Sequence, residues 1–574
     1  MVTEERMTVG ALSVCADKQQ LTIELNGKPL TRAPWFTLEI ETMGRFTPEE
    51  MTASVRQDDA RLITVSHISA DGRVKIRSAV MEDRGDIRVS CDVSVDWLVT
   101  PQVAFLRLDW LSALSLDGYG VRYPGCTVPA PNGGDAFIHK SCADMPLSLI
   151  GEDGRGVSMY FDGGDHGPLR NGTLRAIGDE KSLRETRMKC RLNPAMHTVS
   201  DVLIHAIEGG WEACFLHARE HLHAGFDASL FQREDLKWLD QCVLGHFAFA
   251  YGEECYDYDT DTFRMDRVLE SGTRFGGWDY VVLWNQYPRL GLDERHIWDM
   301  NRDFPGGMKG LREAVELAHK SGVRVFLPYM PWDRDPHDSE YDIAEKMRTL
   351  LMESRADGLF MDTMNTVSPL YRKAADAAGE GRVLLVENTP PGQYDISVSQ
   401  GSWDQYHTPQ AMPEANRLRF LFPEHTLYEC ARWHVGSEKD TDIKRAMFNG
   451  MRFIVWEDIF GVMLPFDDRQ TAAIKRWKSI FNRYSDCMNG TPIPLLPTCD
   501  KAIYLNLFRG NMRAVAALYN ASEEAFAGLA AELPGFASCR VICGCSSANY
   551  INGKLYADLP AKEVALIELM EDIT

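Results

Sequence analysis

The segment 311–362 reads LREAVELAHKSGVRVFLPYMPWDRDPHDSEYDIAEKMRTLLMESRADGLFMD and contains two helical patterns, each followed by a short apolar run. The first helical pattern repeats apolar residues every three or four positions and stops at Gly322, a residue type that commonly follows a helix. The runs 323–329 and 358–362 are apolar at successive positions, as strands covered on both faces are. The segment therefore predicts parallel βα units.

Similar apolar runs extend this pattern in both directions along the chain. We expect eight parallel strands, at 242–250, 280–285, 323–329, 358–362, 383–387, 402–406, 426–430 and 453–457. Helical stripes separate several of these runs, and the span 236–485 has the usual length of a (β/α)8 fold. The sequence therefore predicts an α/β protein with a central TIM barrel over 236–485.

Antiparallel β-structure is expected on both sides of the barrel. In 87–97 apolar residues alternate with Arg, Ser and Asp, which is the pattern of a half-buried strand. Turn signals such as Asn26-Gly27 and Asp71-Gly72 punctuate the N-terminal part, and Gly510-Asn511 separates two apolar runs near the C-terminus. We predict an N-terminal β-sandwich domain over 1–235 and a small C-terminal β-sandwich domain over 486–574.

Charge and composition argue against several classes of partner. Lys and Arg number 61 against 83 Asp and Glu, which gives a formal net charge of −22. Such a charge repels nucleic-acid phosphates and anionic membrane surfaces, and no stretch approaches the ~18 apolar residues of a membrane span. The first residues lack the apolar core of a secretory signal. We expect a cytoplasmic protein that binds neither nucleic acid nor membrane. The sequence leaves open whether the chain forms a homo-oligomer.

Carboxylates stand at the ends of two consecutive predicted strands. Asp362 closes the fourth strand and Glu387 the fifth, and (β/α)8 enzymes carry their reacting groups at these C-terminal ends. Two carboxyl groups at one barrel height can cleave a glycosidic bond. A short Asp among polar neighbours favours an ionised nucleophile, and the apolar run before Glu387 favours a proton donor. Either carboxylate alone could instead have a structural role, in a salt bridge or as a helix cap.

A sugar site also needs flat apolar faces and forked polar groups. Both kinds of side chain recur near the predicted strand ends, although each aromatic alone is more often a core residue. The candidate substrate-binding residues are Trp284, Asn285, Tyr329, Trp332, Asp333, Asn365, Trp403, His407, Trp456, Glu457 and Asp458. The expected partner is therefore a carbohydrate substrate, such as an oligosaccharide or a glycoconjugate.

Neither a cofactor nor a metal is expected. No glycine-rich phosphate loop follows a predicted strand. The tract 331–338, PWDRDPHD, contains Asp and His, but without a recognisable ligand spacing. It is more typical of a polar substrate loop or a solvated turn.

Three stretches carry a resemblance to known glycoside hydrolases. The stretch 298–308, WDMNRDFPGGM, a helix that ends near His319, and 322–332, GVRVFLPYMPW, together resemble the melibiase-type α-galactosidases and their α-glucosidase relatives. The stretch 358–365, GLFMDTMN, is similar to the fourth-strand nucleophile segment of those families. The resemblance implies a retaining glycosidase that acts on an α-linked galactoside, glucoside or N-acetylgalactosaminide, with Asp362 as the nucleophile.

The families that this chain resembles differ in their acid/base residue. In the α-galactosidase clan it is an Asp after strand six, which here is Asp404. In the endo-α-N-acetylgalactosaminidases and the α-amylase family it is a Glu after strand five, a position that Glu387 fits. We favour Glu387 because its strand is unambiguous, and Asp404 remains the alternative. Segments 284–288 and 388–391 depart from the α-galactosidase pattern, which indicates a separate branch.

Other functions on the same fold remain open, because a fold does not establish a function. One is a non-catalytic carbohydrate-binding or scaffolding protein. Another is a barrel enzyme, such as a glycosyl transferase or a lyase, that uses the same carboxylates.

Overall fold

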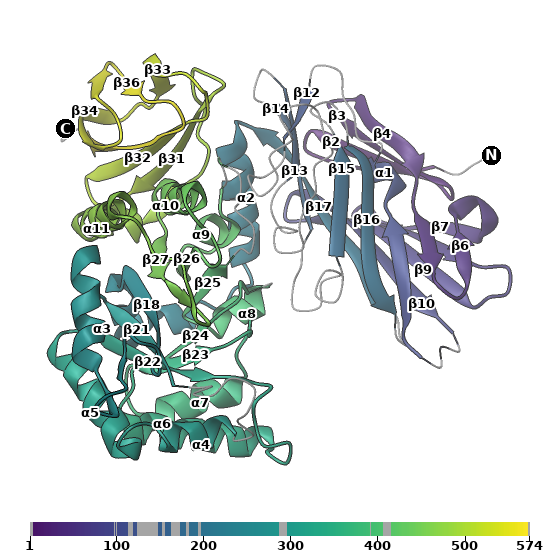
Figure 1. The fold of residues 1–574 in the computed structure, drawn as a ribbon. Helices are drawn as coiled ribbons and strands as arrows, with labels where there is room; N and C mark the ends of the chain where they lie inside the picture. Colours follow the sequence, from purple (N-terminus) through teal and green to yellow (C-terminus); the bar gives the residue numbers. More distant parts are fainter. Residues whose placement is uncertain are drawn as a thin grey trace. The chain divides into compact units, whose positions relative to one another are not determined.

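Eight parallel strands close into a barrel in the computed structural model (Figure 1). The residues that it describes are 4–96, 98, 100–112, 119–122, 147–151, 155–161, 173–178, 183–192, 197–285, 296–390, 392–405, 412 and 415–571. The barrel strands, in order, are β18 (Leu244–Phe249), β21 (Tyr280–Trp284), β22 (Arg324–Tyr329), β23 (Gly358–Met361), β24 (Val383–Val386), β25 (Gly401–Gln405), β26 (Thr426–Cys430) and β27 (Arg452–Val455). Each begins within two residues of its expected start, so the predicted (β/α)8 barrel is confirmed.

Helices connect the barrel strands, and two more, α11 and α12, follow the last of these strands. They are α3 (Met265–Ser271), α4 (Ile297–Arg302), α5 (Gly307–Lys320), α6 (Glu340–Ser354), α7 (Pro369–Ala378), α8 (Gln393–Ser397), α9 (Arg417–Leu421), α10 (Ser437–Asn449), α11 (Asp468–Arg483) and α12 (Ser485–Met488). Helix α5 buries the expected stripe of Leu311, Ala314, Val315 and Ala318. It ends where Gly322 adopts a φ of 75°, a conformation that glycine reaches without strain.

Aromatic side chains identify which strand positions face the barrel interior. Phe247 on β18, Phe360 on β23 and Trp403 on β25 contact one another, with ring centroids 4.3 to 6.0 Å apart. These strands lie on different sides of the barrel, so the three rings meet inside it. Because side chains alternate along a strand, the residues two positions beyond Phe360 and Trp403, namely Asp362 and Gln405, also face inward.

The N-terminal part consists of antiparallel sheets. Its eight-stranded sheet has the order β12 (Tyr119–Arg122), β13 (Leu147–Gly151), β14 (Arg155–Phe161), β17 (His197–Glu208), β10 (Asp86–Val95), β9 (Val74–Asp83), β8 (Leu62–Ile68) and β7 (Thr52–Asp59). The five-stranded sheet has the order β15 (Thr173–Gly178), β16 (Leu183–Leu192), β11 (Gln102–Arg107), β5 (Thr37–Ile40) and β6 (Gly44–Phe46). Strand β16 contacts β10 and β17, so the two sheets pack as layers.

A four-stranded sheet and short helices complete this part. The sheet comprises β1 (Glu5–Val9), β2 (Leu12–Ala16), β3 (Gln20–Leu25) and β4 (Lys28–Pro34), and the α-helices are α1 (Asp109–Ser112) and α2 (Trp211–His223). Strand β10 contains the expected alternation of buried and half-buried residues. The predicted N-terminal antiparallel sandwich is thereby confirmed as part of the fold.

Strands return after the barrel. A five-stranded sheet contains β30 (Thr491–Ile493), β31 (Ile503–Arg509), β32 (Arg513–Asn520), β37 (Val564–Glu571) and β34 (Phe536–Cys543), and a three-stranded sheet contains β33 (Phe526–Glu532), β36 (Lys554–Leu559) and β35 (Ser547–Ile551). They are the yellow strands of Figure 1. Strands β31 and β32 form the expected hairpin around Gly510-Asn511.

Residue contacts divide the chain into two units. The first comprises 1–225 with 414–417 and 494–497, and the second holds the barrel and the C-terminal strands. In the described part of the chain, no helix is both long enough and apolar enough to cross a lipid bilayer.

Candidate active site

Asp362 and Glu387 form the centre of the site. Asp362 directly follows β23 and Glu387 directly follows β24, and these neighbouring strands pair Met361 with Val386 in register. The two carboxyl groups therefore leave adjacent strands at the same height and on the inner face of the barrel. Their residues are only 8% and 4% exposed, respectively. The structure brings together the two carboxylates that the sequence singled out.

Three donors surround the carboxylate of Glu387. The backbone N–H of Thr363 donates to Oε2 over 2.7 Å, and the Gln405 side-chain amide donates to Oε1 over 2.8 Å. A guanidinium nitrogen of Arg432 lies 3.5 Å from the same Oε1. These donors fix the position of the Glu387 carboxyl group.

Backbone strain accompanies one of these donors. Thr363 has a φ of 54°, which is unusual for a β-branched residue. This conformation turns its N–H toward Glu387. Strain of this kind persists where the surrounding structure over-determines it, and such positions cluster at functional sites.

The environment of Asp362 favours its protonated form. Burial and the neighbouring Glu387, which hydrogen-bonds to Asp362 and repels its charge, together raise the pKa of Asp362 from 3.8 to about 9, although Arg432 opposes the change. Two carboxyl groups in direct contact cannot both ionise at neutral pH without a large electrostatic cost. Asp362 therefore keeps a proton at neutral pH.

Aromatic rings and a thiol line the inner face beside the pair. The Arg432 guanidinium lies 4.7 Å above the ring of Trp456, and Trp456 stacks on Phe247 with ring centroids 4.1 Å apart. Cys430 pairs in register with the inward-facing Gln405, and burial raises the pKa of its thiol. The predicted Trp456 thus belongs to the wall that contacts the carboxylate pair through Arg432.

Asp404, the alternative acid/base, lies on the other face of its strand. Its neighbours Trp403 and Gln405 face the barrel interior, so alternation turns Asp404 outward. It pairs in register with Glu429, whose side chain binds Arg445 on the surrounding helix α10. The inward residue of this strand beside Glu387 is therefore Gln405.

Packing explains the position of several predicted sugar-binding residues. Trp403 is fully buried, and its indole N–H donates to the Tyr280 hydroxyl over 3.1 Å within the barrel core. Trp284 is also buried, against Phe247 and Phe249. Neither ring offers a free face to a sugar in this structure.

Two further predicted residues point toward the helices. The amide of Asn285 donates to Asn301 of helix α4 over 2.7 Å. Tyr329 packs against Trp298 of α4 and Tyr371 of α7. Both residues therefore join strand ends to the helical layer.

The remaining predicted residues lie in loops or in ion pairs. Trp332, which is 54% exposed, and Asn365 are exposed, and Asp333 is half-buried. Glu457 accepts a hydrogen bond from Arg274 over 2.5 Å, and Asp458 accepts one from the N–H of Gly461 over 2.7 Å. These last two carboxylates have structural partners.

His407 lies outside the described residues.

Sequence reasoning missed Gln405 and Arg432, which both contact Glu387. The run Cys430-Ala-Arg-Trp433 carries the available signal, because a cation follows the end of strand seven beside an aromatic residue. Strand alternation would have selected Gln405 over Asp404, because Trp403 is the apolar residue that must be buried.

No family model matches the chain, and no curated protein matches it either. Solved structures, in contrast, share its fold. The α-N-acetylgalactosaminidase NagBb from Bifidobacterium bifidum, in complex with GalNAc, superposes with a TM-score of 0.60 at 12% identity, covering 89% of this chain and 98% of that one.

Two other glycosidase structures superpose over nearly the whole chain. The α-galactosidase AgaA from Geobacillus stearothermophilus gives a TM-score of 0.51 at 11% identity, covering 99% of this chain and all of the other. A β-arabinopyranosidase gives 0.53 at 9% identity, with coverages of 98% and 100%. At these identities the likeness establishes the fold alone. The expected resemblance to the α-galactosidase and α-N-acetylgalactosaminidase enzymes is thus confirmed at the level of the fold.

Proposed function

We propose that this chain is a retaining glycoside hydrolase that acts on an α-linked sugar, with Asp362 as the nucleophile and Glu387 as the acid/base. The observation that carries the proposal is the buried carboxyl pair on adjacent barrel strands. The fold supports it, because the similar structures are an α-N-acetylgalactosaminidase, an α-galactosidase and a β-arabinopyranosidase.

The proton count of the pair agrees with this reaction. Double displacement needs one ionised carboxylate to attack the sugar and one protonated carboxyl group to release the leaving group. The raised pKa of Asp362 keeps a proton on that residue at neutral pH, beside the Glu387 carboxyl group that accepts from Thr363 and Gln405. Substrate binding must therefore shift this proton toward Glu387, and the contact between the two carboxyl groups provides a short path.

In the first step the Asp362 carboxylate attacks the anomeric carbon. A carbon–oxygen bond forms to Asp362 while the glycosidic carbon–oxygen bond breaks, and the leaving oxygen takes the proton of Glu387. Glu387 becomes a carboxylate in this step. Its new charge is stabilised by Gln405 and Arg432, which lie within 2.8 and 3.5 Å of Oε1.

In the second step water replaces Asp362 at the same carbon. Glu387 accepts a proton from the attacking water, and the ester bond to Asp362 breaks, which returns the pair to its starting proton count. Two displacements at one carbon retain the anomeric configuration. The aromatic wall of Trp456 and Phe460 beside Arg432 supplies apolar surface near the reacting carbon.

Turnover of aryl glycosides tests the proposal directly. The panel should contain the α-N-acetylgalactosaminide, α-galactoside and α-glucoside and the β-arabinopyranoside, with proton NMR of the first product formed. We expect hydrolysis of at least one substrate with retained configuration. Inversion would contradict the double displacement. Binding of the sugars without turnover would instead support a carbohydrate-binding protein.

Azide rescue separates the roles of the two carboxylates. Glu387→Ala should lose activity on substrates with poor leaving groups, and azide should restore turnover and give a glycosyl azide of retained configuration. Asp362→Ala should give the azide of inverted configuration. Asp404→Asn is the discriminating variant, because it should stay active if Glu387 is the acid/base. Loss of activity in Asp404→Asn, with Glu387→Ala still active, would favour the alternative.

A further inference from the structure

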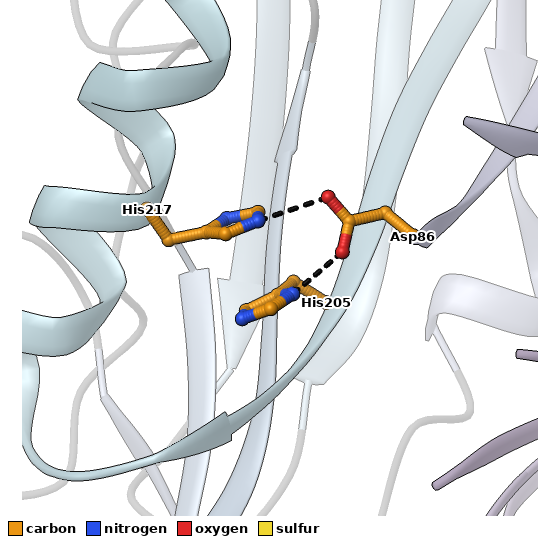
Figure 2. Close-up of side chains that lie close together, drawn as sticks. All are labelled: Asp86, His205 and His217. Carbon is orange, nitrogen blue, oxygen red and sulfur yellow. Dashed lines mark hydrogen bonds and ion pairs between the residues drawn. The ribbon is translucent and has the colours of Figure 1, made fainter. Parts of the chain in front are cut away.

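Three side chains of types that bind metal ions meet in the N-terminal unit, outside the barrel segment. Asp86 begins strand β10, His205 lies on the neighbouring strand β17, and His217 lies on helix α2 (Figure 2). His205 Nδ1 is 2.5 Å from one oxygen of the Asp86 carboxylate, and His217 Nε2 is 2.9 Å from the other. The two imidazole rings stack with centroids 3.4 Å apart and planes within 8°.

The imidazole nitrogens and the carboxylate oxygen lie close enough together to bind one cation. One atom from each residue lies within 4.8 Å of the other two. Zinc binds imidazole nitrogen at about 2.0–2.1 Å and carboxylate oxygen at about 2.0–2.2 Å, so ligand atoms around it lie about 3.3 Å apart. To reach that spacing, the present distances of 2.5 and 2.9 Å must widen by about 0.8 and 0.4 Å, respectively. An ion would then replace the protons that join the rings to Asp86.

The burial of the three side chains suits an open coordination site. The side chain of Asp86 is 4% exposed, whereas those of His205 and His217 are 28% and 21% exposed. The carboxylate is thus buried, while both rings are partly exposed to solvent. Among the described residues, the ion pairs of Asp86 are with these two histidines.

A second cluster, around His221 on the same helix, contains an arginine in addition to histidine and aspartate. His221 lies one turn after His217, but its Nε2 is 3.1 Å from a guanidinium nitrogen of Arg88. Arg88 also binds Asp83 and Asp201, at 2.5 and 2.9 Å. The Arg88 guanidinium supplies the positive charge between these side chains. We therefore do not expect His221 to bind a metal ion.

We propose that Asp86, His205 and His217 form a binding site for a divalent transition-metal ion of the zinc class, completed by water. Two imidazoles and one carboxylate favour zinc, cobalt or nickel over magnesium and calcium, which prefer all-oxygen sites. The ion would link helix α2 to the two central strands of the eight-stranded sheet. The sequence expectation of no metal rested on spacing in the chain, and these ligands are assembled from distant segments.

Zinc titration of the untagged, chelator-treated chain tests the site. Calorimetry should find one zinc ion per chain with a dissociation constant in the micromolar range or below, and magnesium should give no signal. Cobalt should give the visible absorption bands of a four- or five-coordinate ion, a readout that needs no variant. Absence of both the zinc isotherm and the cobalt bands would overturn the proposal.

Variants assign the ligands. His217→Gln and Asp86→Asn should each weaken zinc binding at least tenfold, whereas the matched control His221→Gln, one turn along the same helix, should bind zinc as the parent chain does. Equal loss in His217→Gln and His221→Gln would contradict the assignment. Circular dichroism of each variant identifies a folding failure. Because zinc binding is measured without turnover, its outcome is independent of the glycosidase proposal.

Discussion

At the scale of single residues, the buried carboxyl group of Asp362 makes stability depend on pH. Asp362 is buried against another carboxyl group, which raises its pKa to about 9. The folded chain therefore keeps a proton that the unfolded chain releases above pH ~4. It follows that this residue contributes less and less to stability as the pH rises from about 4 toward 9.

Asp362→Asn should stabilise the protein in a pH-dependent manner. The amide cannot ionise, so the free energy of unfolding should rise by about 1–3 kcal/mol at pH 8 and change little at pH 4. Urea unfolding at the two pH values measures the difference. Asp458→Asn, in the exposed hairpin of β28 (Asp458–Ile459) and β29 (Val462–Met463), is the control and should show no such gain. A pH-independent effect of Asp362→Asn would refute the shared proton.

Arg432 is expected to set the charge balance of the pair. It lies 3.5 Å from Glu387 and lowers the pKa of Asp362 against the effects of burial and Glu387. If the proposed function holds, Arg432→Met should lower kcat about 100-fold and move the acidic limb of the pH–rate profile to higher pH. Arg274→Met, which removes the partner of Glu457, is the matched control. Equal losses in both variants would mean that the effect is only structural.

At the scale of elements, a close approach of backbones sets the height of the carboxylates. Strand β23 begins at Gly358, where an added Cβ would lie 2.1 Å from the carbonyl oxygen of Val383 on β24 and 2.7 Å from the ring of Phe326. Glycine therefore allows β23 and β24 to pair in register. That register puts Asp362 beside Glu387.

Gly358→Ala should disturb both stability and the site. The clash is with backbone, which cannot rotate away, so we expect a loss of about 2–4 kcal/mol in unfolding free energy and a loss of turnover. Urea denaturation and an aryl-glycoside assay measure the two effects. In Gly392→Ala the nearest atom is a carboxylate oxygen of Asp395 at 3.5 Å, so that control should lose less than about 1 kcal/mol. Similar losses in both variants would count against the close-approach argument.

Local pattern predicted these elements well because each barrel strand is covered on both faces. Continuous apolar runs and the glycine after α5 are visible in any short window of sequence. Local pattern does not determine whether a residue at a strand end faces the barrel interior or the surrounding helices. Trp403 and Asp404 are neighbours, and only the packing of Trp403 against Phe360 inside the barrel decides that Asp404 turns outward.

At the scale of the whole molecule, the chain contains two units with separate cores. Calorimetry should accordingly resolve two unfolding transitions. Zinc should raise the temperature of only the transition that belongs to the N-terminal unit, if the metal site is as proposed, because a ligand stabilises the unit that binds it. Asp362→Asn should shift only the other transition. A single transition that zinc and Asp362→Asn shift alike would show that the units unfold together.

The sequence by itself determined the order of the elements, the eight barrel strands and the acidic strand ends Asp362 and Glu387, because apolar periodicity and strand ends are local features. Only the tertiary structure decided which groups act on those carboxylates, since Gln405 and Arg432 reach Glu387 through barrel closure. The triad of Asp86, His205 and His217 likewise exists only after strand pairing and helix docking. Contacts between distant segments depend on how the whole chain packs, and no short stretch of sequence records them.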